Sequence, residues 1–252
     1  MVFLAFSAFL AGLIDAIVGG GGLIQIPALF SALPKELPAT LFGTNKFASV
    51  FGTSSAAWRY AHQVNMPWRT ILPAAFAAFA CAYLGAMAVA WLPRGMLRPL
   101  ILLLLVGAAF YTFRRKTFGS AHRPLHTGRR ELVLALLAGG LIGFYDGFFG
   151  PGTGSFLIFL FVRFFGFDFL HASAAAKVVN VATNLAALGF FIPNGYWLPL
   201  LAVLMALLNV AGSLVGSHLA LRHGSAFVRQ IFLLVVSLLI CKFAWDLWIV
   251  PI

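Results

Sequence analysis

Two lysines, Lys46 and Lys177, lie inside apolar segments of this 252-residue chain. A charged side chain at the centre of a bilayer costs at least ~2.5–3.5 kcal/mol, so such a lysine is expected to face a cavity or an opposite charge. An ammonium group among amides and hydroxyls is typical of a site for a small anion. Snorkelling to the membrane interface and a structural ion pair are the alternatives. The polar neighbours are Thr44, Asn45 and Ser49 for the first lysine, and Asn180, Thr183 and Asn184 for the second.

A glycine cluster precedes each lysine, at residues 19–22 and at residues 150–154. Glycine costs about 1 kcal/mol and proline about 3 kcal/mol inside a helix, so each cluster is expected to end one. A helix that starts after such a break points its free N–H groups and the positive end of its dipole toward the break, which favours anions. The predicted substrate-binding residues are therefore Lys46, Lys177, Asn45, Ser49, Asn180, Asn184, Gly20, Gly21, Gly22, Gly152, Thr153 and Gly154.

Asp15 and Asp146 each lie four residues before a glycine cluster. Intramembrane carboxylates often carry protons in coupled transporters, and we take both as candidates for proton coupling. They fit equally well as counter-ions of the lysines or as helix caps, and the sequence leaves these three interpretations open.

These residues recur at a constant offset. A shift of 131 places Asp15 on Asp146, Gly19 on Gly150 and Lys46 on Lys177 without a gap. Intramembrane charges and helix breakers are rare, so their coincidence indicates an internal duplication.

The elements that must position these residues are membrane helices. Hydrophobic residues make up 62% of the chain and charged residues 9%, whereas a soluble domain has roughly 25% charged residues. The net charge of +11 comes from short basic segments between apolar runs, which indicates membrane loops rather than a nucleic-acid surface. The apolar runs are 2–33, 38–58, 70–92, 97–113, 131–165, 169–192, 198–221 and 227–250.

The runs 2–33 and 131–165 are too long for a single span of about 20 residues. If each turns back at its glycines, eleven lysines and arginines face one side of the membrane and three face the other. If each instead crosses once, the split is eight against six. The positive-inside rule therefore favours re-entrant runs in two inverted halves, with both termini outside and the basic loop 114–130 inside.

Two pairs of motifs resemble a known family. The stretches GLIDAIVGGGGLIQIPAL (12–29) and GTNKFASVFGT (43–53), with GFYDGFFGPGTGSFLIFLF (143–161) and ASAAAKVVNVATNLAAL (172–188), resemble the two half-signatures of the TauE/SafE family of sulfite-exporter-like membrane proteins. The resemblance covers nearly the whole chain. It implies a transporter of small sulfur-containing or organosulfonate anions in the cytoplasmic membrane of a prokaryote.

We therefore expect an all-α integral membrane protein with two inverted repeats, each with a glycine-broken re-entrant helix pair and three transmembrane helices. The expected domains are a first repeat (1–113), a basic cytoplasmic loop (114–130) and a second repeat (131–252). The expected function is export of sulfite or a related sulfur anion by a multi-pass protein of the cytoplasmic membrane. A carrier for another small anion, such as a carboxylate, and an anion channel are the alternatives.

The sequence contains no constellation of a hydrolase, a kinase or a metal enzyme, so we expect no enzyme activity, no cofactor and no metal. The expected partners are a small anionic substrate and the lipid bilayer, and no nucleic acid. Whether the chain forms a homo-oligomer is left open.

Overall fold

The structure, a computed structural model, describes residues 2–88, 119 and 121–249, and these residues form helices and connecting loops without a strand. The predicted run 97–113, Arg94, Arg98 and the expected domain boundary at residue 113 lie outside the described residues. The helices are α1 (Val2–Val18), α2 (Gly22–Ala32), α3 (Pro38–Gln63), α4 (Trp68–Ala88), α6 (Arg129–Phe148), α7 (Thr153–Phe165), α8 (Phe169–Phe191) and α9 (Pro199–Ile249).

Four of the described helices are long and apolar enough to cross a membrane: α4, α6, α8 and, over Pro199–Leu238, α9. The helix α3 has 26 residues, but its polar residues around Lys46 lower its hydropathy. The prediction of an all-helical membrane protein is thus confirmed at the level of secondary structure and membrane-spanning segments.

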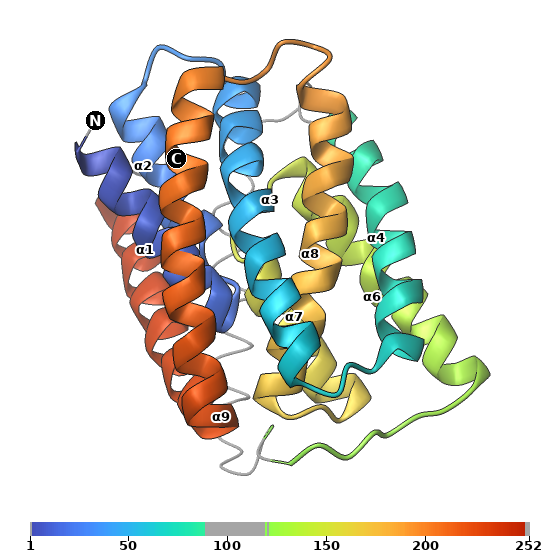
Figure 1. Ribbon diagram of the computed structural model, residues 1–252. Coiled ribbons are helices and arrows are strands. Elements are labelled where there is room, and N and C mark those ends of the chain that lie inside the picture. Colours follow the sequence, from blue (N-terminus) through green and yellow to red (C-terminus); the bar gives the residue numbers. More distant parts are fainter. Residues whose placement is uncertain (1, 89–118, 120, 250–252) are drawn as a thin grey trace.

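The helices on either side of the two glycine clusters form hairpins. In Figure 1, α1 runs from the upper end of the bundle to its middle and α2 returns to the upper end. Likewise, α6 enters from the lower end and α7 returns there. The helices α1, α2 and α7 have 17, 11 and 13 residues, fewer than the about 20 that a complete crossing needs.

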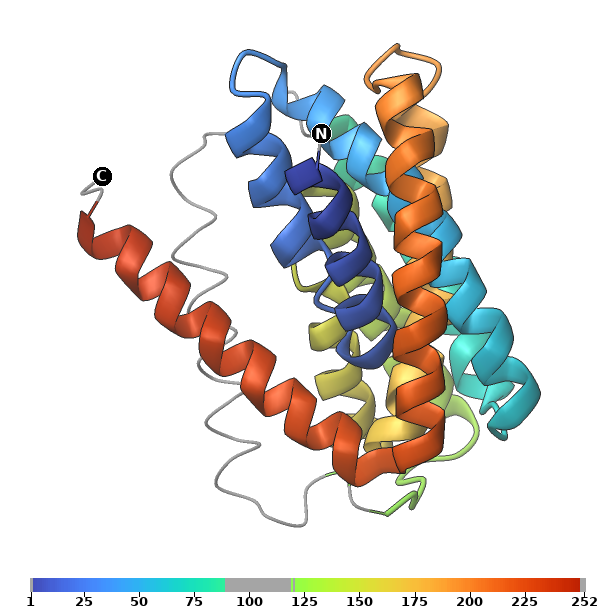
Figure 2. The ribbon, with the colours of Figure 1, turned by 60° about the vertical axis from the view of Figure 1, so that its left-hand side comes forward.

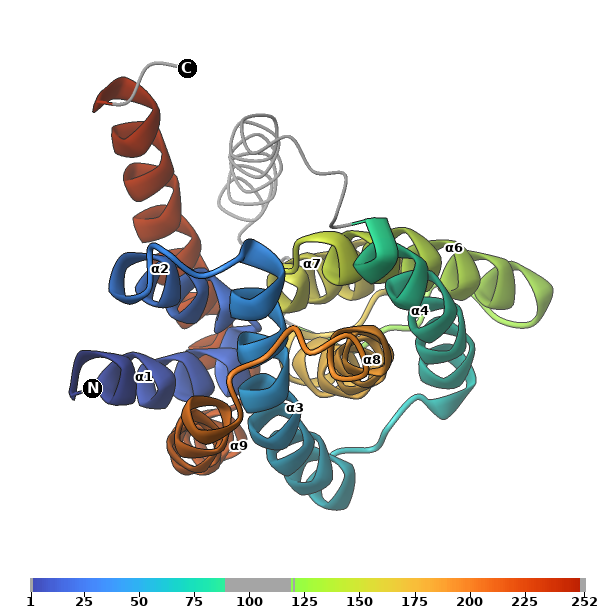
Figure 3. The same cartoon turned by 90° about the horizontal axis from the view of Figure 1, so that it is seen from above.

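The helices that carry the lysines lie at the centre of the molecule. Figure 3 shows α3 and α8 side by side, with α1, α2 and the first arm of α9 on one side and α4 and α6 on the other. The second arm of α9 leaves the bundle at a kink, where Gly224 has φ of 72° (Figure 2).

Local sequence explains where the central helices begin. Pro38 occupies the first turn of α3, where its missing N–H costs nothing. Asp168 caps α8, because its side chain accepts a hydrogen bond from the N–H of His171 at 2.8 Å. Gly166 ends α7 in the left-handed conformation that glycine adopts without strain.

Small residues allow the outer helices to pack backbone against backbone. A Cβ on any of three glycines of α6, spaced four residues apart, would overlap the backbone of a matching alanine of α4. Such stripes of small residues bring membrane helices into close contact, where van der Waals attraction replaces the hydrophobic effect. The pairs are Gly139 with Ala74, Gly143 with Ala78 and Gly147 with Ala82.

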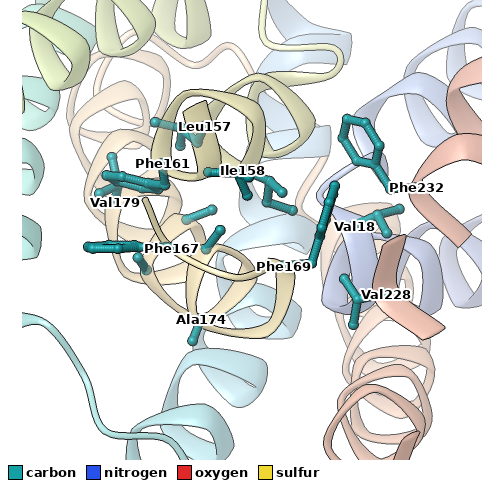
Figure 4. Close-up of a cluster of buried hydrophobic side chains, with 14 of the residues drawn as sticks. Val18, Leu157, Ile158, Phe161, Phe167, Phe169, Ala174, Val179, Val228 and Phe232 are labelled. Atoms are coloured by element: carbon teal, nitrogen blue, oxygen red, sulfur yellow. The ribbon is translucent and has the colours of Figure 1, made fainter. Parts of the chain in front are cut away.

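One apolar cluster connects the hairpins to α8 and α9. Figure 4 shows side chains from the end of α1, from α7, from α8 and from the second arm of α9 meeting in it. Phe161 and Phe169 are fully buried there. This cluster fixes the two helix breaks relative to the helix that carries Lys177.

Candidate functional site

The two helix breaks contact each other in the middle of the bundle. The backbones of Gly19 and Gly154 are so close that a Cβ on either would overlap the other. The N–H of Ser155 donates to the carbonyl of Gly19 at 3.2 Å, and its hydroxyl donates to the carbonyl of Val18 at 2.8 Å. Gly19 and Gly152 have φ of 75° and 83°, so the turns themselves also favour glycine. The breaks therefore form one connected unit built from both halves of the chain.

Lys46 of α3 forms a buried ion pair with Asp146 of α6. Its Nζ lies 2.5 Å from Oδ2 of Asp146, and the two side chains are 4% and 2% exposed. The pair connects the lysine of the first half to the aspartate of the second.

Lys177 of α8 pairs with Asp15 of α1, so here the lysine comes from the second half and the aspartate from the first. Its Nζ lies 3.4 Å from Oδ2 of Asp15, which also accepts a hydrogen bond from the hydroxyl of Thr53 at 3.1 Å. Each aspartate is thus the counter-ion of the lysine in the other half, one of the interpretations that the sequence left open.

A small cavity lies between the breaks and the two central helices. It comprises about 280 Å³ of space not filled by protein atoms, and this space includes open solvent. Backbone at the breaks, two carboxylates, an ammonium, amides and a hydroxyl line it. The lining residues are Asp15, Gly19, Gly22, Asn45, Lys46, Ser49, Asp146, Gly150, Gly154, Asn180 and Asn184.

Most of the residues predicted for the site line this cavity, and five do not. Those that do not are Lys177, Gly20, Gly21, Gly152 and Thr153. The first is fully buried against Asp15, and the others lie within the breaks. The prediction omitted Gly19 and Gly150, although both belong to the glycine clusters that the sequence analysis identified.

Some of the polar side chains around the cavity form hydrogen bonds with each other. Nδ2 of Asn184 donates to Oδ1 of Asn180 at 3.2 Å, and the hydroxyl of Thr183 donates to the main-chain carbonyl of Asn180 at 3.0 Å. Oδ1 of Asn45 is buried and has no hydrogen-bond partner within the described part of the chain. Buried polar atoms are nearly always paired, and an amide oxygen accepts hydrogen bonds, so the missing partner is a donor such as water or the O–H of a protonated ligand.

The electrostatic balance of the site limits what can bind. Two ammonium groups and two carboxylates give no net formal charge. An anion beside Lys46 therefore has to share that ammonium with Asp146. Within the described residues, the one group of side chains suited to a metal ion lies outside this cavity.

Comparisons with known proteins agree with the motifs. The sequence profile of the family described as Sulfite exporter TauE/SafE matches residues 4–243. The "Probable membrane transporter protein ORF9" of Sinorhizobium sp is 37% identical over 93% of this chain and 88% of its own length. The "Probable membrane transporter protein YfcA" of Escherichia coli K12 is 34% identical over 96% of this chain and 89% of its own length. No solved structure matches the chain significantly.

Proposed function

Since this chain belongs to the sulfite exporter TauE/SafE family, we propose that it is a secondary membrane transporter that exports a small anion, namely sulfite or a related sulfur oxyanion or organosulfonate. The observation that supports this most is the cavity between the two helix breaks, where Lys46, paired with Asp146, lies among amides and a hydroxyl. The names of the relatives, which describe probable membrane transporters, agree with it.

The donors of the cavity suit an oxyanion. Lys46 supplies charge, while Asn45, Ser49, Asn180 and Asn184 supply neutral donors from two helices. Hydrogen bonds from an ammonium group to an anion are roughly twice as strong as neutral ones, so Lys46 dominates the attraction. The small volume restricts the substrate to a compact anion.

The two lysines have different roles in this proposal. Lys46 lines the cavity, so we assign the contact with the anion to it. Lys177 is 0% exposed and pairs with Asp15, so we assign it a positioning role that holds α8 against α1 beside the first break.

We further propose that the chain consists of two inverted repeats, 1–113 and 131–252, joined by the basic loop 114–130. Contacts between the halves support this division. When 131 is added to residue numbers in the first half and subtracted from those in the second, each contact below becomes another contact of the structure. The pair Lys46–Asp146 becomes Lys177–Asp15. The packing of Gly143 on Ala78 becomes that of Gly12 on Asn209, and Gly85 on Phe144 becomes Gly216 on Leu13.

The charge of the loaded site makes export favourable. The four ionised groups of the empty site balance, so a bound anion gives the site a net negative charge. A membrane potential that is negative inside then favours exit by about 2.3 kcal/mol per charge per 100 mV. A proton on a carboxylate would cancel that charge, which keeps Asp15 and Asp146 as our candidates for proton coupling.

The proposed topology places the end of α7 on the cytoplasmic side. Arg163 is exposed near that end, whereas Lys35 is exposed in the connection from α2 to α3, at the other end of the bundle (Figure 1). In a variant without Cys81 and Cys241, we expect Arg163→Cys to react with an impermeant thiol reagent from the cytoplasm and Lys35→Cys from outside. Labelling of Arg163→Cys from the outside alone would rule out the re-entrant arrangement.

The proposed substrate class is tested by ligand-induced stabilisation of the purified protein. A ligand that binds the folded state at a hundred times its Kd stabilises it by about 2.7 kcal/mol. We expect sulfite, thiosulfate or a short sulfonate to raise Tm, and acetate and sodium chloride at equal ionic strength to leave it unchanged. Stabilisation by a carboxylate alone would replace the sulfur assignment. If a cation or a neutral solute bound and no anion did, the anion transporter itself would be rejected.

A further inference from the structure

A second group of ligand-type side chains lies at the end of the bundle, in the loop before α6 and at the start of α8. It consists of His122 in this loop, and of Asp168 and His171 at the helix start. Each offers a ligand atom, and these atoms all lie within 4.8 Å of one another. The rings of His122 and His171 stack with their centroids 4.0 Å apart.

Backbone hydrogen bonds hold the loop against the start of α8. The N–H of Arg123 donates to the carbonyl of Gly166 at 2.8 Å, and that of Leu125 donates to Phe165 at 3.0 Å. The N–H of Phe169 donates to Gly119 at 3.0 Å. Backbone hydrogen bonds of its neighbours therefore hold His122 over α8, in addition to the stacking of its ring on His171.

The cluster contains an unused nitrogen. Nδ1 of His122 is buried and has no hydrogen-bond partner among the residues that the structure describes. Buried polar atoms usually have a partner, and a metal ion would occupy this lone pair.

Two contacts with His171 orient the carboxyl group of Asp168. Its Oδ2 lies 2.8 Å from Nδ1 of His171, and its Oδ1 accepts the N–H of the same residue at 2.8 Å.

We propose that His122, Asp168 and His171 form a binding site for a divalent transition-metal ion of the Zn²⁺ type. Two imidazole nitrogens and one carboxylate oxygen are a donor set of zinc sites with an open fourth position, whereas Mg²⁺ and Ca²⁺ prefer oxygen ligands. Ligand atoms around tetrahedral zinc are about 3.3 Å apart, so the stacked rings have to turn toward the ion. Binding also releases to solvent any proton on the imidazole nitrogen that becomes a ligand.

The ion would connect the loop before α6 to the helix that contributes Asn180 and Asn184 to the cavity. His171 lies in the first turn of α8, which also supplies Lys177, Asn180 and Asn184. The site is separate from the cavity and does not depend on the proposed function. The sequence did not predict it, because Asp168 and His171 are adjacent on one helix but His122 reaches them only through the folded loop.

The test uses the full chain, purified without a polyhistidine tag and stripped with a chelator. We expect isothermal titration with ZnCl₂ to show one site per chain, and Zn²⁺ to raise Tm. His122→Ala and His171→Ala should each weaken Zn²⁺ binding at least about tenfold, since even residues that only orient a ligand are worth that much. The control is His62→Ala, at the exposed end of α3, which should bind like the wild type.

His122→Ala keeps the hydrogen bonds that fix the loop, and its metal-free Tm should match that of the wild type. Equal Zn²⁺ affinity of this variant and the wild type would overturn the proposal. So would an absence of Zn²⁺ binding to the wild type, or equally tight binding of Mg²⁺ at the same site.

Discussion

Replacing Lys46 by methionine together with Asp146 by asparagine is expected to abolish anion binding while the protein remains folded. The single Lys46→Met variant would leave a buried carboxylate without its cation, which costs about 3–5 kcal/mol of folding stability. A loss of anion binding in that variant could then result from unfolding. The double variant removes both charges of this ion pair and leaves neither partner uncompensated. Without the ammonium, we expect the affinity for sulfite to fall at least about a hundredfold, the equivalent of about 3 kcal/mol.

Three further variants make this result specific. Lys35→Met removes an exposed lysine and should bind sulfite like the wild type. Lys46→Arg should restore little binding, because a planar guanidinium does not replace a compact ammonium. Asp146→Asn alone frees Lys46 from its competitor, so we expect a lower Tm without anion and a larger increase in Tm with sulfite. Unchanged sulfite affinity in the Lys46→Met/Asp146→Asn protein would remove Lys46 from the site.

Breaking the second ion pair is expected to destabilise the protein strongly. Lys177 is fully buried, and in Asp15→Asn its ammonium would lose its carboxylate partner. Lys177→Met would leave Asp15 with the hydroxyl of Thr53 as its described hydrogen-bond donor. We expect each single variant to lose about 3–5 kcal/mol of stability, measured by thermal or denaturant unfolding in detergent.

The double variant Lys177→Met/Asp15→Asn should recover most of that loss, because it leaves no unpaired charge. A double-mutant cycle gives the coupling between the two residues directly. We expect the double variant to retain sulfite binding within about tenfold, since a positioning residue acts only indirectly. A loss of binding as large as that of the Lys46→Met/Asp146→Asn variant would show that Lys177 contacts the anion.

The charged groups of the site could be identified from the sequence, but not their pairing. Lysines and aspartates inside apolar segments are rare enough to stand out. Asp15 has Lys46 in its own half and Lys177 in the other, and the spacing does not distinguish these partners. The folded structure shows the pairing, because Nζ of Lys177 lies 3.4 Å from Asp15 while Nζ of Lys46 lies 2.5 Å from Asp146.

The helix breaks were predictable and their packing was not. A cluster of glycines indicates that a helix ends, but the residues that fill the space around it come from distant segments. Gly143 and Gly147, which bring α6 onto α4, look in the sequence like ordinary members of an apolar run. Which glycine serves a turn and which serves close contact depends on tertiary structure.

The most direct test of the central proposal is sulfite efflux from liposomes under an imposed potential. The wild type and the Lys46→Met/Asp146→Asn variant are reconstituted in equal amounts, loaded with sulfite, and given a potassium-valinomycin potential that is negative inside. We predict that the potential accelerates efflux through the wild type, and that the variant releases sulfite no faster than protein-free liposomes. Equal efflux through both proteins, or wild-type efflux no faster than from protein-free liposomes, would contradict the proposal.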